Sequence, residues 1–246
     1  MKERIFIALK NNKNYMFVVI SIMIQKLLLD MTNMEYYGYY FLSGVPITAN
    51  YAIHNLCLAL WFFPVYFILQ VSSGKLYNLF HGYGTLLIVR NYSKLTLICK
   101  HIFKLFFDML IVLIFQVIVI NINNPYISNV KTTDIIRMII IYFFTFIVLL
   151  LIQTYLELYI EHNIATLIIN IYIVLSVMMS NIITLNNFVH LLNYFFIPCY
   201  GMGFRNGIIE SNYEVIFYNN AITILIFLIF TITYMIYKKM KRNDIL

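Results

Sequence analysis

Charged residues are scarce in this chain of 246 residues, where Asp, Glu, Lys and Arg together make up 11% of the sequence. Soluble domains carry about a quarter of their residues as these four types. Hydrophobic residues account for 62%, and the mean hydropathy is +0.83. This composition excludes a soluble globular domain and predicts an all-α integral membrane protein. A net charge of +7 then reports orientation in the membrane, and we infer no nucleic-acid partner.

Cysteine is rare as well, and its three positions lie in three different segments. Cys57, Cys99 and Cys199 have neither the CxxC nor the Cys/His spacing of a zinc site, and they form no disulfide framework. The Gly74-Lys75 pair lacks the upstream glycine and the following Ser or Thr of a P-loop. The sequence therefore predicts no metal, no resident cofactor and no enzymatic activity in this chain.

Six apolar stretches are candidates for crossing the bilayer, within one transmembrane domain over residues 1–246. Thirteen of the 17 Lys and Arg residues fall on one side of this arrangement: four before the first stretch, five between the second and third, and four after the sixth. The positive-inside rule then places both termini in the cytosol. The approximate limits of the six spans are 15–30, 51–70, 105–122, 138–156, 164–182 and 215–237.

Three segments outside the spans carry further expectations. Apolar and basic residues mix over 1–14, which predicts a short amphipathic helix lying on the inner leaflet before the first span. Residues 31–50 are rich in Tyr and Gly, which favours a non-helical aromatic segment at the outer interface. Residues 187–204 are apolar but interrupted by Pro198 and two glycines, which favours a re-entrant or interfacial helical hairpin on the outer face.

Lys26 and Asp108 are the ionisable residues nearest the interior of a predicted span. Lys26 can extend outward and pair with Asp30 at i+4. Asp108 follows Lys104 by four residues, and we expect an ion pair between them at the inner interface. An ion-coupled secondary transporter would need such groups at mid-depth on several spans. That alternative function therefore depends on these two residues alone.

Glu157 and Glu161 end the fourth predicted span with i,i+4 spacing, and His162 follows them. Carboxylates on one helix face beside a histidine could hold a metal ion. No HExxH-type companion occurs in another span. We therefore expect the two glutamates to contact Lys or Arg side chains across the cytosolic surface.

The longest polar interruption runs from Gly74 to Lys104 and holds five basic residues and no acidic residue. Apolar side chains recur with helical spacing from Leu76 to Leu87, which predicts an amphipathic helix. A short helix of this kind on the cytosolic side either lies on the membrane or binds a groove of a partner protein. Periodicity alone does not separate these two possibilities.

Within this interruption, the stretch GTLLIVRNYSKLTLICK resembles the loop between spans two and three of ABC-2 type ABC transporter permeases. The sequence departs from that family's pattern at 80–83, where Phe, His and Tyr stand in place of acidic residues. The six spans, the amphipathic start and the broken outer segment also match the family. Size and composition are most similar to the Gram-positive peptide exporters and immunity permeases, such as the phenol-soluble modulin exporter. The residues that carry the local resemblance are Gly84, Thr85, Leu86, Leu87, Arg90, Ser93, Lys94 and Lys100.

The resemblance implies the permease subunit of an exporter in a bacterial plasma membrane. Residues 84–94 would then contain the coupling helix, which sits in a cleft of a separate cytosolic ATPase that binds ATP and Mg²⁺. A second permease subunit, identical or paralogous, would complete a route faced by spans one, two and five. The cargo would be an amphipathic peptide or a lipid-like molecule. A membrane scaffold or sensor is the non-transport alternative, and it would stimulate no ATPase.

Overall fold

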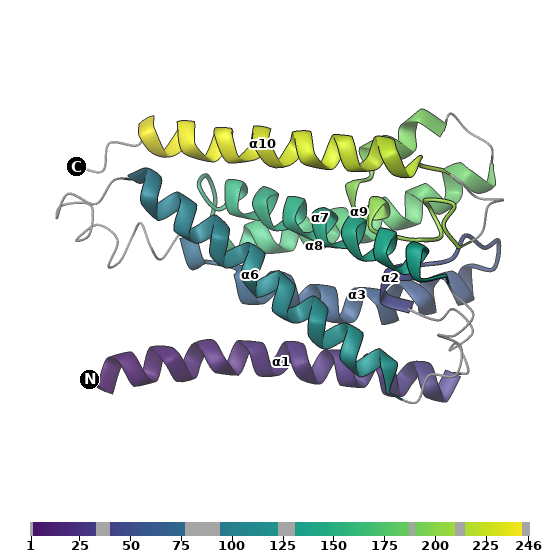
Figure 1. Ribbon diagram of the computed structural model, residues 1–246, viewed down its shortest axis with the longest axis horizontal. Coiled ribbons are helices and arrows are strands. Elements are labelled where there is room, and N and C mark those ends of the chain that lie inside the picture. Colours follow the sequence, from purple (N-terminus) through teal and green to yellow (C-terminus); the bar gives the residue numbers. More distant parts are fainter. Residues whose placement is uncertain are drawn as a thin grey trace.

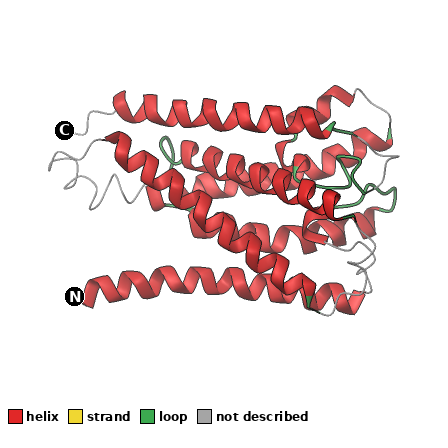
Figure 2. Cartoon of the chain, viewed as in Figure 1, coloured by secondary structure: helices red, strands yellow, loops and turns green. Residues whose placement is uncertain are grey.

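The computed structural model describes residues 2–32, 40–76, 94–122, 131–186, 190–209 and 215–242. All regular elements in these ranges are helical, as Figure 2 shows. Six long helices run alternately up and down one bundle (Figure 1): α1 (Lys2–Thr32), α3 (Tyr51–Ser72), α6 (Lys94–Asn121), α7 (Thr132–Leu156), α8 (His162–Leu185) and α10 (Tyr218–Arg242). Three short elements complete it: α2 (Tyr40–Ser43), the 3-10 helix η3 (His190–Phe195) and α9 (Ile197–Tyr200).

Five helices in the described ranges are long and apolar enough to cross a bilayer: α3, α6 from Thr96, α7, α8 and α10 as far as Met240. They correspond to the expected spans two to six and are those of a multi-pass membrane protein. Their outward side chains include Phe107, Leu167 and Phe230, which are 63%, 58% and 71% exposed. Apolar surface of this extent is suited to contact with lipid.

Helix α6 begins at Lys94, well before the expected limit of 105. Three of the five basic residues that precede the third span, Lys94, Lys100 and Lys104, therefore belong to the same helix as the span.

Helix α1 runs without a break from Lys2 to Thr32. The expectation of a separate short helix over 1–14 is therefore wrong in this structure. No Gly or Pro occurs between these two residues to interrupt the backbone hydrogen bonds. At about 1.5 Å per residue, the 31-residue helix is roughly 46 Å long, which exceeds the hydrocarbon thickness of about 30 Å.

The segment from Tyr40 to Val45 is buried in the bundle and is helical from Tyr40 to Ser43, whereas the sequence favoured a non-helical segment at the interface; residues 33–39 lie outside the described ranges. Phe41 and Leu42 are 1% and 0% exposed. The Tyr40 hydroxyl donates to the carbonyl of Cys57 in α3 at 2.5 Å, inside the bundle. Tyrosine and glycine are typical both of an interfacial belt and of a tight buried turn, and composition did not distinguish them.

The broken outer segment is helical in part, with η3 and α9 separated at Phe196. It is tied to the α2 turn by backbone bonds from Gly203 N–H to the Leu42 carbonyl at 2.9 Å and from Phe204 N–H to the Ser43 carbonyl at 3.1 Å. A Cβ atom on Gly44, where φ is +77°, would lie 2.6 Å from the Met202 Cβ. Only glycine permits this approach.

The starts of α1, α6 and α8 and the ends of α3, α7 and α10 lie at one end of the bundle (Figure 1). Most of the lysines and arginines of the described residues are at this end, which we call the basic end. The α2 turn and α9 lie at the opposite end (Figure 1). The arrangement of helices agrees with the sequence-based count of basic residues on the two sides.

Candidate functional site

A buried polar cluster lies at the basic end, where the end of α3 meets α7 and α8. We call it the α3 anchor, and it consists of Ser73, Gly74, Gln153, Glu157 and Thr166. The Glu157 Oε1 accepts hydrogen bonds from the Gly74 N–H at 3.0 Å and from the Gln153 Nε2 at 3.3 Å. Gly74 follows the last turn of α3 with φ at +71°, a left-handed conformation that glycine adopts without strain.

Gln153 joins all three helices of the α3 anchor. Its Nε2 lies 3.2 Å from the Leu69 carbonyl of α3 and 3.0 Å from the Thr166 Oγ1 of α8. Thr166 Oγ1 is in turn 2.8 Å from the Ser73 Oγ. Side chains of α7 and α8 therefore hold the last turn of α3 in place.

Glu157 is 4% exposed, although sequence reasoning placed it at the cytosolic surface. Burial raises the pKa of its carboxyl to about 7, against the opposing effects of the Gly74 N–H, Gln153 and Lys75. Glu161 is exposed and makes no side-chain capping bond at the start of α8. Glu157 and Glu161 lie between the end of α7 at Leu156 and the start of α8 at His162, so they do not share one helix face, and the expected contacts of Glu161 with Lys or Arg stay a prediction.

Lys75, the residue after Gly74, reaches two further helices. Its Nζ lies 2.8 Å from the Asp108 Oδ2 of α6 and 3.4 Å from the Tyr15 hydroxyl of α1. The Lys75 and Asp108 side chains are 18% and 19% exposed. Burial lowers the pKa of Lys75, and the nearby Asp108 carboxylate opposes that shift. Asp108 thus pairs with Lys75, whereas the expected partner was Lys104.

The other intramembrane candidate, Lys26, pairs with Asp30 as the i,i+4 spacing predicted. The coupling-helix residues Gly84, Thr85, Leu86, Leu87, Arg90 and Ser93 lie outside the described residues. Lys94 is the first residue of α6, and only its backbone is described. Their proposed contact with an ATPase therefore stays a prediction.

Arg205, at the opposite end, is a buried residue that sequence reasoning missed. Its side chain is 0% exposed, and its Nη1 donates to the Ser180 Oγ of α8 at 2.6 Å. Its carbonyl accepts bonds from the N–H groups of Val215 and Ile216, both at 3.0 Å. The sequence signal for this site was the position of Arg205, a single arginine between the broken outer segment and the last predicted span. No three or more His, Cys, Asp or Glu side chains converge as a metal site within the described ranges.

A family model described as "Protein of unknown function (DUF2705)" matches residues 18–246. The chain belongs to the DUF2705 family. "Uncharacterized protein YybK" of Bacillus subtilis (strain 168) is 25% identical over 243 residues, which cover 95% of this chain and 96% of that protein. No solved structure shows a significant match. The DUF2705 match includes every residue of the α3 anchor.

The ion pair between Lys75 and Asp108 is expected to show a coupling energy of about 1–2 kcal/mol in a double-mutant cycle with Lys75→Met and Asp108→Asn. The value lies between those of exposed and buried pairs because both side chains are about one-fifth exposed. Free energies of unfolding in mixed detergent micelles would measure it. The Lys26–Asp30 pair, in which Asp30 is 40% exposed, is the matched control, with about 0.5 kcal/mol. Equal coupling in both pairs would contradict a special position of Lys75.

Proposed function

We propose that this chain is the permease subunit of an ATP-binding-cassette exporter in a bacterial cell membrane, with ATP hydrolysis in separate cytosolic subunits. Helix α1 would be the first of six spans, and the basic end would face the cytosol. The supporting observation is the position of Gly74 and Lys75. These residues lie about ten residues before the expected coupling segment, 84–94, and are bonded to Glu157 at the end of α7, to α6 and to α1, while the adjacent Ser73 contacts α8.

Such contacts are what an energy-coupling segment requires. Buried hydrogen-bonded groups are costly to separate, so helices joined through them move together. A partner that displaces the expected coupling segment, 84–94, would act on Gly74 and Lys75 through the chain that joins them. Through the Glu157 carboxylate and the Asp108 carboxylate, that displacement would reach α7 and α6. A docking segment without such ties would not move the spans.

A groove of about 580 Å³ between α3 and α8 supports the proposed route and the second permease subunit. These helices correspond to the expected spans two and five. The groove is mostly apolar but also carries the amide side chains of Gln70, Asn163 and Asn170. Amide groups facing lipid are unfavourable because hydrocarbon offers them no hydrogen bonds. We propose that this face lies against the second subunit and contacts amphipathic cargo.

The ion-coupled carrier is less well supported. Asp108 and Lys26 are each ion-paired within the described residues. Neither is placed as an unpaired group at mid-depth, where ion coupling would need it.

Replacing Leu86, Leu87 and Arg90 together with alanine is expected to abolish retention of the ATPase in an affinity pull-down from the native membrane. The apolar stripe and the basic side chain are the groups that a cleft would bind. The variant should still be inserted in the membrane, because the five spanning helices are unchanged. Membrane fractionation would check insertion.

Lys238→Ala is the matched control, since it removes an exposed basic side chain from the same end without altering the segment. This variant should retain the ATPase. Full retention by the triple variant would overturn the coupling-helix assignment. Absence of any ATPase from the wild-type pull-down would favour the scaffold or sensor instead.

A further inference from the structure

A second groove, with a volume of about 400 Å³, lies between α1 and α6. Tyr15 and Asp108 line it nearest the basic end, and Ile22 and Phe115 line it seven residues further along each helix. Both helices start at the basic end (Figure 1), so the groove extends about 10 Å towards the middle of the bundle. Within the described part of the chain, the residues lining its deeper part are all apolar and include Val19 and Ile111.

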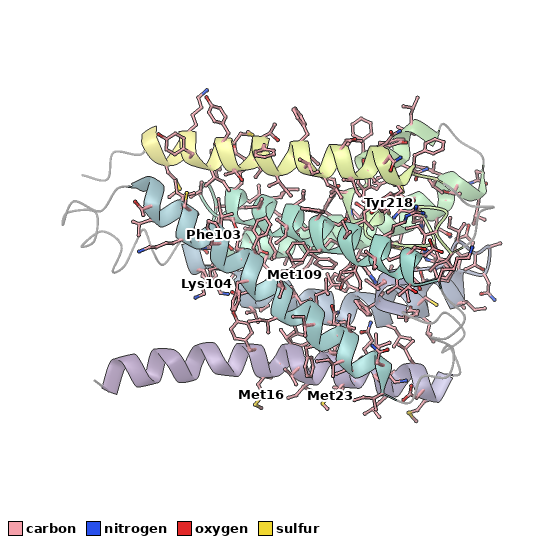
Figure 3. The ribbon with its side chains drawn as sticks, in the orientation of Figure 1. Met16, Met23, Phe103, Lys104, Met109 and Tyr218 are labelled. Carbon is pink, nitrogen blue, oxygen red and sulfur yellow. The ribbon has the colours of Figure 1, made fainter. Side chains whose placement is uncertain are left out.

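Two lysines lie near the basic end of this α1–α6 groove. Asp108 lines both the groove and a small void that Lys75 also lines, and the two side chains form an ion pair. Lys104, one turn before Asp108, is exposed and close enough to influence the charge of Lys75. Figure 3 draws Lys104 below α6, on the side towards α1. Lys75 is paired with Asp108, and the Glu157 carboxyl that also acts on Lys75 is buried in the α3 anchor, so Lys104 is the exposed charge on this side of α6.

We propose that the α1–α6 groove binds one anionic phospholipid of the cytosolic leaflet. An acyl chain would lie along Val19, Ile22 and Ile111, and the phosphate would lie near Lys104 and Lys75. Basic pockets between membrane helices on the cytosolic side are suited to such headgroups. The inference goes beyond the proposed function: it depends on the basic end facing the cytosol and needs no ATPase.

The lining distinguishes this groove from the one between α3 and α8. Its rim residues Val19, Ile111 and Phe107 are 37%, 47% and 63% exposed and purely apolar. Among the described side chains, no amide lines it to bond with another helix, whereas three amides line the α3–α8 groove. An apolar slot with a cationic mouth matches an acyl chain joined to a phosphate better than it matches a second copy of the chain.

Photo-crosslinking of the full chain in nanodiscs tests this proposal. Phosphatidylglycerol and phosphatidylcholine probes with a diazirine on the acyl chain would be compared, and labelled peptides would be identified by mass spectrometry. The phosphatidylglycerol probe should label the peptides that contain 15–22 and 107–115 about fivefold more than the phosphatidylcholine probe. Lys104→Gln should bring the two probes close to equal labelling.

A second variant fills the groove itself. Val19→Trp combined with Ile111→Trp should remove most labelling by either probe. Met16→Trp is the control, because Met16 is 58% exposed and does not line the groove; Figure 3 shows it pointing away from α6. Labelling that is equal for both probes in the wild type, or unchanged by Lys104→Gln, would overturn the proposal. A photo-reactive amino acid at Val19 or Ile111 that crosslinks two protomers in place of lipid would also overturn it.

Discussion

Replacing Glu157 with alanine is expected to lower the free energy of unfolding by about 2–4 kcal/mol. The carboxylate accepts the buried Gly74 N–H and an amide proton of Gln153. Alanine would leave the Gly74 N–H without an acceptor and would open a cavity where α3, α7 and α8 meet. Denaturant titration of the purified protein in mixed micelles would measure the loss.

Two further variants separate hydrogen bonding from charge. Glu157→Gln keeps an oxygen that can accept the Gly74 N–H, so we expect it to cost about 1 kcal/mol or less. Glu161→Ala removes an exposed glutamate four residues away and should change stability by about 0.5 kcal/mol at most. If Glu157→Ala were as mild as Glu161→Ala, the α3 anchor would not hold the end of α3.

The stability of the chain is expected to fall as the pH rises from about 4.5 to about 7. Glu157 has a pKa of about 7 in the folded protein and an ordinary value of 4.5. Between these values the folded protein keeps the proton that the unfolded chain has lost, so a higher pH favours unfolding. The contribution is present in full below pH 4.5 and is lost above pH 7. Its size is on the order of 3 kcal/mol.

The comparison of wild type with Glu157→Gln isolates this carboxyl from every other titrating group. Glutamine does not ionise, so the stability difference between the two proteins should change between pH 4.5 and pH 7 and stay constant above. Thermal unfolding in detergent at closely spaced pH values would record it. Parallel stability curves for the two proteins would contradict the burial of an ionisable Glu157.

These two predictions bear on the proposed coupling because Glu157 holds Gly74, which lies ten residues before the proposed coupling segment, 84–94. A carboxyl group that titrates near neutral pH can hold Gly74 in either protonation state, since one oxygen accepts in both. We therefore expect Glu157→Gln to preserve transport and Glu157→Ala to weaken it. If the Glu157→Ala variant lost transport but was still inserted in the membrane, the defect would lie at the α3 anchor.

Local patterns in the sequence predicted the local features of the structure. The length of the apolar stretches predicted the five helices that correspond to spans two to six, and the i,i+4 spacing predicted the Lys26–Asp30 ion pair. The partner of Asp108 could not be obtained in this way, because Lys75 approaches from a different helix. Spacing favoured Lys104, which is exposed. The choice of Lys75 as the partner of Asp108 depends on how the helices pack, which residue types alone do not specify.

The burial of Glu157 and Arg205 was also beyond sequence reasoning. Glu157 follows an apolar span and precedes a polar turn, which is equally typical of a surface glutamate. Its burial depends on the Gly74 N–H meeting it from α3. Arg205 was counted only for its charge, although the turn around it packs against α8 through Ser180. In both residues the deciding partner is more than 20 positions away in the chain.

ATP hydrolysis by an ATPase that co-purifies with this chain, reconstituted with it in nanodiscs, tests the permease proposal most directly. The ATPase would be incubated with wild-type chain, with the Leu86→Ala, Leu87→Ala and Arg90→Ala triple variant, and with Lys238→Ala. We predict that wild type and Lys238→Ala raise the hydrolysis rate several-fold above that of the ATPase alone, and that the triple variant does not. A rate that is the same with all three proteins and with empty nanodiscs would contradict a role as an ATP-driven permease.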